Sequence, residues 1–178
     1  MTNFTYKYSD TELKELLKSI TIICDSREKE NSHITDYFNQ KKIPHITQAL
    51  KYGDYSYMLP ACRELGISRD IYFYNDIVIE RKASLEELSG NLSQQRERFE
   101  HEFLRARGCD ITLLIEQGSY SDILNHKYKT EFKEASFMAS LMSWEQRYNI
   151  KTSFIQKIHS GAYIHSKFYY HLREYLKR

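Results

Sequence analysis

A strand end that carries both signs of charge is the stretch of this sequence best suited to chemistry. The run Ile-Val-Ile at 77–79 passes directly into Glu80, Arg81 and Lys82, which predicts a buried strand with charges at its end. Side chains alternate along a strand, so Glu80 and Lys82 should share one face and Arg81 the other. With Asp54 brought in from a neighbouring strand, these groups supply hard oxygen ligands for Mg²⁺ and an adjacent cation. In outline, this arrangement cleaves phosphodiesters.

A plainer explanation fits the charged triplet at 80–82. Short motifs often match by chance, so the triplet alone is explained more simply as a salt-bridged strand end in an ordinary α/β domain. The segment 54–59 predicts a strand by its alternation, and Gly53 permits the backbone irregularity that aims Asp54. Antiparallel pairing of this strand with 71–82 brings Asp54 to the triplet only in the right register, which the sequence does not fix.

Composition indicates a globular intracellular protein. The 178 residues are 41% hydrophobic and 28% charged with a net charge of +2, which predicts one domain over 1–178. That charge does not prove a nucleic-acid partner, although acids gathered at a metal site would mask a basic face. The three cysteines are widely separated, which indicates neither a disulfide framework nor a zinc site. No targeting segment or membrane span is recognisable, so we expect a cytoplasmic location.

The spacing of apolar residues predicts alternating helices and strands. Residues 9–20 begin with a capping box and continue with leucines at helical spacing. A charged loop over 25–30 follows a buried strand at 21–24, and ligands of open α/β sheets bind at such strand ends. A long helical segment should kink at Gly90. Further strands are expected at 45–50, 54–59, 71–82, 111–116 and 152–156, and further helices around 34–41, 84–107, 134–148 and 160–176.

Five short motifs follow one another along the chain. Together they resemble the nuclease domain of the XPF-type structure-specific endonucleases, over roughly residues 20–176, and several motifs in order are more specific than one. The resemblance implies a restriction-endonuclease-like core with a central mixed sheet flanked by helices. It also implies divalent-metal cleavage of branched DNA, in repair or recombination, by a stand-alone bacterial or phage member. The motifs are Asp25-x-Arg27-Glu28, Gly53-Asp54-Tyr55, Ile79-Glu80-Arg81-Lys82, Gln95 with Arg98, and Leu113-Leu114-Ile115-Glu116.

The chain departs from the pattern of this family in four places. The family motif ERKxxxD ends in Glu86, which keeps a carboxylate on a longer side chain, and the following D-G-R is Ser-Gly-Asn at 89–91. The excursion over 59–75 is longer than the usual connection between the GDY and ERK motifs. The sequence contains neither a tandem helix-hairpin-helix region nor a helicase. The preferred DNA substrate therefore stays open.

The resemblance also implies roles for individual residues. Asp54 and Glu80 are expected as principal ligands of one or two Mg²⁺ ions, with Mn²⁺ as a substitute, and Asp25 as a third carboxylate. We expect Lys82 to orient the attacking water or to stabilise charge on the phosphate; as a base it would need a lowered pKa. The remaining motif residues are expected to contact DNA or support the site. Arg27 and Arg81 should bind phosphate or pair with Glu28. Gln95 and Arg98 should hold the carboxylates in place, and Glu86 is included by its place in the motif.

Two functional hypotheses follow. An active endonuclease on branched, flapped or fork-like DNA is favoured, because the acids and the lysine are all present. The alternative is a catalytically silent DNA-binding subunit of a nuclease complex.

A homodimer is expected through the helices at 134–148 and 160–176. Trp144 and Tyr163 lie off the inner apolar stripes of these helices, and aromatic side chains in such places are typical of interface anchors. The alternative is that both rings cover the edge of the core of their own domain.

Overall fold

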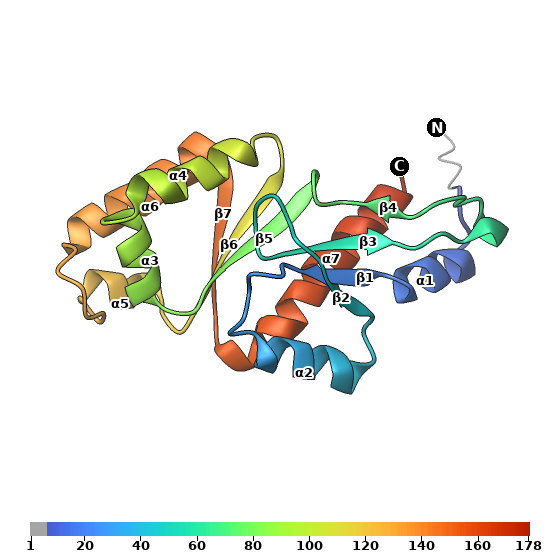
Figure 1. The fold of residues 1–178 in the computed structure, drawn as a ribbon, viewed down its shortest axis with the longest axis horizontal. Helices are drawn as coiled ribbons and strands as arrows, with labels where there is room; N and C mark the ends of the chain where they lie inside the picture. The colour runs from blue at the N-terminus through green and yellow to red at the C-terminus, as the bar shows by residue number, and fades with distance from the viewer. Residues whose placement is uncertain (1–6) are drawn as a thin grey trace, which may run out of the picture.

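The computed structural model describes residues 7–178, built around one mixed β-sheet (Figure 1). Residues 1–6 lie outside this description. The prediction that the N-terminus contains no targeting segment falls partly on them. The strand order is β2-β1-β3-β5-β6-β7, with β4 paired to β3. The strands are β1 Thr21–Cys24, β2 His45–Thr47, β3 Tyr55–Leu59, β4 Ile71–Tyr72, β5 Ile77–Lys82, β6 Asp110–Glu116 and β7 Ile150–Ile155.

The sheet contains both kinds of strand pairing. Strand β3 is antiparallel to β1, β4 and β5, whereas β1 and β2, β5 and β6, and β6 and β7 pair in parallel. This confirms the predicted α/β class with a mixed sheet. The helices are α1 Asp10–Lys18, α2 Ser32–Lys41, α3 Leu85–Leu92, α4 Arg96–Arg105, α5 Tyr120–Leu124, α6 Glu134–Tyr148 and α7 Ser160–Leu176, with short 3₁₀ turns at Arg63–Leu65 and Lys157–His159.

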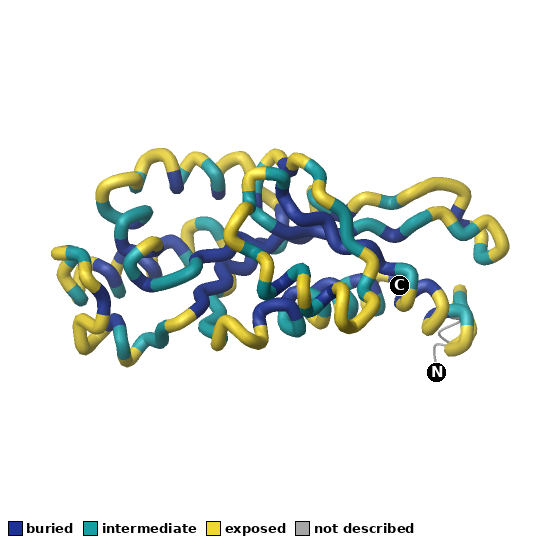
Figure 2. Tube along the Cα trace, turned by 60° about the horizontal axis from the view of Figure 1, so that its bottom comes forward, coloured by how far each residue is buried: buried dark blue, intermediate teal, exposed yellow. Residues whose placement is uncertain are grey.

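Two apolar clusters cover the two faces of the sheet. Helices α1, α2 and α7 pack with Ile77 and Ile79 of β5 on one side. Helices α3, α4, α5 and α6 pack with Val78 of the same strand on the other side. The alternation of β5 therefore joins both clusters through one strand. Figure 2 shows the buried chain running along the middle of the molecule, with exposed segments outside it.

Several predicted elements are confirmed. The capping box at α1 forms: the Ser9 backbone N–H donates to Glu12 at 2.7 Å, and the Glu12 N–H donates to the Ser9 hydroxyl at 3.4 Å. Helices α6 and α7 have the predicted bounds, and β1 occupies 21–24. Within residues 7–178, no helix has the length and apolar character that a membrane span requires.

The predicted long helix over 84–107 is wrong, because it is two helices. The break lies at 93–95 and not at Gly90. The Ser93 hydroxyl donates to the Ser89 carbonyl at 2.6 Å, and the Gln95 N–H donates to the Gly90 carbonyl at 3.1 Å. These bonds compete with the regular helical pattern and end α3, so α4 starts in a new direction.

The predicted strand over 71–82 is also interrupted. The N–H groups of Asp76 and Ile77 both donate to the Phe73 carbonyl at 2.9 Å, which closes a turn between β4 and β5. The predicted strand at 45–50 ends at 47. Helix α5 was not predicted, since its five residues are too few to show a periodicity.

The two predicted interface anchors lie inside their own domain. Trp144 is 2% exposed, and its ring contacts Phe99 and Phe103 at centroid distances of 5.3 and 5.6 Å. Tyr163 is half-buried, and its hydroxyl lies 2.7 Å from the Ser153 hydroxyl. Their assignment as interface anchors is wrong, because α4 and β7 cover the sides of α6 and α7 that carry these rings.

Candidate active site

The pairing of β3 with β5 brings Asp54 to the charged triplet. The Asp54 N–H donates to the Ile79 carbonyl at 2.8 Å, and the Asp54 Oδ2 accepts the Arg81 N–H at 2.7 Å. Gly53 makes this approach possible: its φ is +71°, and an added Cβ would lie 2.8 Å from the Val78 Cβ. Only glycine fits both the conformation and the space.

Glu80 and Lys82 form a buried pair on one face of β5, as the alternation predicts. The Lys82 Nζ donates to the Glu80 Oε1 at 2.7 Å, lies 3.6 Å from the Glu87 Oε1, and lies 4.6 Å from the centre of the Phe99 ring. Burial lowers the pKa of Lys82, but the charges of Glu80, Asp54 and Glu87 outweigh this and raise it. The raised pKa favours an electrostatic role for Lys82 over the role of a base.

The pKa of Asp54 moves well above its ordinary value. Burial is the larger cause, and the negative charge of Glu80 adds to it, whereas Lys82 and the Arg81 N–H act in the opposite direction. Burial and a neighbouring negative charge thus both disfavour the ionised form of Asp54.

Arg81 points to the other face, where it is held by carboxylates. Its NH2 donates to the Glu116 Oε2 at 2.7 Å, its NH1 lies 3.4 Å from the Glu28 Oε1, and its side chain is 3% exposed. The His33 Nε2 lies 2.8 Å from the second Glu116 oxygen. Of the two roles expected for Arg81, the structure shows pairing. The role of Glu116 is to fix the strand end whose N–H holds Asp54.

Asp25 is occupied by its own loop. Its carboxylate accepts bonds from the Arg27 N–H at 2.7 Å, from the Arg27 guanidinium twice at 2.9 Å, and from the Leu50 N–H at 2.7 Å. It is 1% exposed and does not line the cleft that contains Asp54 and Glu80. These bonds tie the loop after β1 to the segment before β3. The structure does not bring Asp25 into the site as a third carboxylate.

Asp54, Glu80 and Lys82 open into one cleft of about 500 Å³. Arg27, Glu28, Arg81, Gln95 and Arg98 also line it, as the motifs suggest, and the remaining lining residues include Lys29, Lys51, Tyr52, Glu87, Asn91, Phe99, Glu102 and Arg105.

Two predicted supporting residues have other surroundings. Glu86 does not line the cleft; its neighbour Glu87 does, and it also accepts the Ala83 N–H at 2.8 Å. Gln95 is exposed rather than buried in the apolar stripe, and its Oε1 accepts from the Asn91 amide at 3.1 Å. Within residues 7–178, neither Gln95 nor Arg98 forms a hydrogen bond with Asp54 or Glu80.

Helix α4 contributes lining residues that the sequence analysis missed. Glu102 and Arg105 continue the spacing of three to four residues from Arg98, so all three share one helix face. This spacing is the signal that identifies them. Burial raises the pKa of Glu102, and the nearby charge of Glu80 adds to the effect, which indicates that α4 forms the wall of the cleft facing β5.

The donor atoms in the cleft suit Mg²⁺. In the described part of the chain, Asp54 uses one carboxylate oxygen for the Arg81 N–H, and Glu80 uses one for Lys82. Each keeps a second oxygen that is free to bind a cation. Residues 7–178 contain no cluster of three or more His, Cys, Asp or Glu side chains placed to hold a metal. Two carboxylates fit Mg²⁺, which keeps several waters.

The mixed sheet and its charged cleft define an α/β protein with a nuclease-type core. The model of the ERCC4 domain matches residues 24–167, and the chain belongs to that family. This confirms the resemblance inferred from the motifs. A search of curated proteins finds no match.

Two solved structures have the same fold. XPF from Aeropyrum pernix matches with a TM-score of 0.62 and 18% identity, over 86% of this chain and 65% of that one. XPF from the same organism in complex with DNA matches with a TM-score of 0.61 and 15% identity, over 86% and 66%. The chain thus spans slightly under two thirds of these relatives. At these identities the likeness shows the fold alone.

Proposed function

We propose that this protein is a metal-dependent endodeoxyribonuclease that hydrolyses phosphodiester bonds in branched, flapped or fork-like DNA. The observation that carries the proposal is the convergence of Asp54 and Glu80, from two strands, beside the ammonium group of Lys82. Family membership and the DNA-bound XPF relative support the same substrate class. We further propose that residues 1–178 act as one nuclease domain.

Each charged group has a task in this proposal. Asp54 and Glu80 hold Mg²⁺, or Mn²⁺ in its place, and the bound ion supplies an acidified water and neutralises phosphate charge. Lys82 donates to the attacked phosphate and stabilises the charge that develops on it. Glu87 and the Phe99 ring keep its ammonium group in position. Arg98 and Arg105, on the α4 wall, bind phosphates along the strand.

The test is a cleavage assay with labelled flap, fork, junction and linear duplexes. We expect products from branched substrates with Mg²⁺ and none with EDTA. Glu80→Gln is the matched control, because it keeps the shape of the side chain and removes its charge. Tight DNA binding without cleavage in either Mg²⁺ or Mn²⁺ would overturn the proposal in favour of the silent DNA-binding subunit.

The homodimer stays a prediction, now without the anchors first assigned to it. Met142 on α6 and Tyr170 and Tyr175 on α7 are 46%, 58% and 43% exposed, and they are the large apolar side chains that these helices offer to a partner. Light scattering at micromolar concentration tests the prediction. A mass near the 21.4 kDa of one chain, with cleavage retained, would rule out the dimer as the active form.

A further inference from the structure

A second hollow lies away from the cleft, at the end of the molecule that contains β4, α1 and the C-terminus (Figure 1). It has a volume of about 810 Å³. Three parts of the chain form it: the start of the described residues, the excursion between β3 and β4, and the end of α7. We call it the distal groove; its lining residues include Lys7, Arg69, Asp70, Tyr72, Tyr175 and Arg178.

The distal groove carries a surplus of positive charge. Within residues 7–178, the three cations Lys7, Arg69 and Arg178 form no ion pair. Asp70 is the one acid in the described lining, and its Oδ1 accepts the Ala61 N–H at 2.9 Å. Cations without acidic partners around a hollow attract a polyanion, such as the phosphate backbone of a nucleic acid.

Two exposed tyrosine rings lie among these cations. Tyr72 is 39% exposed and Tyr175 is 43% exposed. The Tyr175 ring meets Phe73 edge-on at 5.0 Å between centroids, and Tyr72 lies 5.6 Å from Tyr74, so both rings are held by aromatic neighbours. Aromatic rings beside cations bind single-stranded nucleic acid, because unpaired bases stack on the rings while the cations follow the backbone. A duplex keeps its base faces stacked internally and cannot use them.

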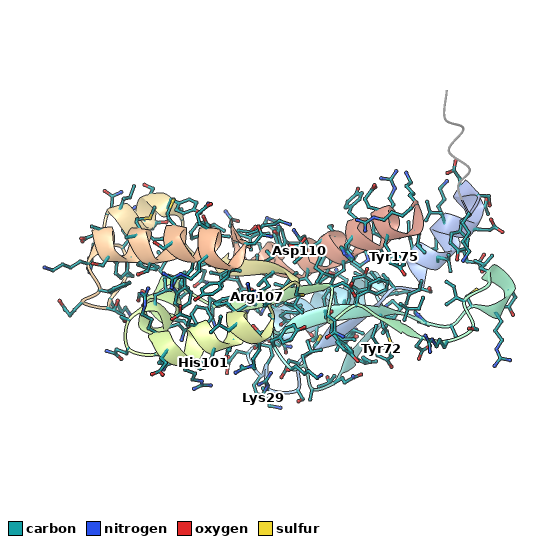
Figure 3. All side chains as sticks on the ribbon, turned by 90° about the horizontal axis from the view of Figure 1, so that it is seen from above. Lys29, Tyr72, His101, Arg107, Asp110 and Tyr175 are labelled. Carbon is teal, nitrogen blue, oxygen red and sulfur yellow. The ribbon has the colours of Figure 1, made fainter. Side chains whose placement is uncertain are left out.

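A continuous strip of residues connects the distal groove to the cleft. Tyr52 lines the cleft, and its hydroxyl lies 3.3 Å from the Asn75 Oδ1. Asn75 follows Tyr74, which pairs with Tyr72 of the groove. In Figure 3, Lys29 of the cleft and Tyr72 lie on the same side of the molecule. The strip at 72–75 belongs to the excursion that is longer than in the XPF-type pattern.

We propose that the distal groove and the strip at 72–75 bind a single-stranded arm of nucleic acid that leaves the cleft. The proposal rests on the proposed nuclease function and refines it, because it makes a single-stranded arm a recognised part of the substrate. It assigns Tyr72 to base stacking, and Arg69 and Arg178 to phosphates.

The test measures binding separately from cleavage. Fluorescence anisotropy of a labelled oligothymidylate and of a blunt duplex is followed in EDTA, with the full chain carrying Glu80→Gln. Adding Tyr72→Ala should weaken single-strand binding about tenfold and leave duplex binding unchanged, since stacking contributes strongly per base. Adding Arg69→Ala should reduce the slope of log affinity against log salt by about 0.7 for the single strand. Leu124→Ala and Lys129→Ala are the controls, because both residues are exposed and lie outside the groove.

The groove variants are then compared in the presence of Mg²⁺ with Glu80 restored. Tyr72→Ala should raise the KM for a flap with a single-stranded arm, with kcat unchanged and linear duplex cleaved as before. Equal single-strand affinity in the groove variants and the controls would overturn the groove proposal, as would equal losses for single strand and duplex. Binding of an acidic peptide to the groove, lost in Tyr72→Ala, with no binding of oligothymidylate there, would overturn the proposal in favour of a protein partner. Failure of cleavage by the unaltered chain concerns the nuclease function alone, because the binding comparison does not use it.

Discussion

The two halves of β5 are buried to nearly the same extent and are opposite in physical character. Ile77, Val78 and Ile79 are at most 1% exposed, and the three charged residues that follow are 5–7% exposed. The apolar half packs into the clusters on both faces of the sheet, and burying such side chains stabilises the fold. The charged half must lose its hydration, and close pairing only partly compensates for that loss. The apolar half of this strand thus stabilises the fold, whereas the charged half, which includes the proposed site residues Glu80 and Lys82, is buried at a cost in stability.

The charged half also has two faces that differ from each other. On the Arg81 face, the guanidinium pairs with Glu116 and Glu28, while its Nε is buried without a hydrogen-bond partner among the described residues. On the Glu80 face, Lys82 is shared by Glu80, Glu87 and the nearby Asp54. Three carboxyl groups therefore surround one ammonium group on the face that opens into the cleft. The first face ties β5 to β6 and to the loop after β1, and we propose that the second receives a cation.

The largest effect is expected from Asp54→Asn. This change removes the carboxyl group whose ionised form is disfavoured both by burial and by the charge of Glu80. Cleavage should fall below detection, because the change removes ligand charge at constant shape. The metal-free variant should unfold at higher temperature than the unaltered chain. The folded-state pKa of Asp54 is raised above 3.8, so its contribution to stability is full below that value and is lost as pH rises. Calorimetry at pH 7 with EDTA measures the difference; an equal or lower midpoint would contradict the proposed electrostatic strain.

The second prediction concerns Lys82→Ala. Loss of a preorganised cation should cost about 2.7–4 kcal/mol of transition-state stabilisation, roughly 10²–10³ in kcat. Metal affinity should stay constant or rise, since a neighbouring positive charge is gone. Lys51→Ala is the matched control, because Lys51 is an exposed cation on the rim of the same cleft. Single-turnover cleavage with a metal titration separates the two effects, and unchanged turnover with weaker metal binding would refute the assigned role.

The third prediction tests the apolar side of the comparison. Trp144→Ala should lower the free energy of unfolding by about 3–5 kcal/mol, because it empties the packing among α4 and α6. Met142→Ala on the same helix should change it little, as Met142 is 46% exposed. Urea denaturation of both variants provides the measurement. A small loss of unfolding free energy in Trp144→Ala would contradict the placement of this ring in the core.

The sequence predicts most of the fold because the signals for its elements are local. Helices α6 and α7 follow from apolar spacing, and Gly53 indicates where Asp54 is aimed. Contacts between distant segments leave no such signal. Asp25 was expected at the metal site because it stands in a motif, but the Leu50 N–H, 25 positions away, binds its carboxylate.

Other differences between the expected and the observed surroundings of residues have the same origin. Trp144 was expected outside the core because the sequence does not show where α4 lies. That position follows from the break at 93–95, which a side-chain bond of Ser93 and a backbone bond of Gln95 create. Glu87 and Glu102 enter the cleft through the direction in which α3 and α4 leave β5. The motifs therefore identify the chemistry, whereas the packing determines which neighbouring carboxylates take part in it.

The smallest effect is expected at His171 on α7, on the face of the sheet that packs against α1, α2 and α7. Its Nδ1 lies 2.7 Å from the Tyr57 hydroxyl, and burial holds its pKa below the ordinary 6.5. Four charged groups act on this imidazole. Asp76 and Asp110 act to raise its pKa, and Arg178 and Lys167 act to lower it. Because the folded-state pKa is lowered, the contribution of neutral His171 is present above pH 6.5 and is lost as pH falls through the folded-state value.

Stability should therefore decline between pH 7 and pH 5, and His171→Gln should reduce this decline. His101→Gln is the control, because His101 is exposed on α4. Denaturant midpoints at several pH values measure the slope. Equal slopes for the unaltered chain and for His171→Gln would place the acid-sensitive group elsewhere, with half-buried His165, whose pKa is also lowered by burial, as the next variant to measure.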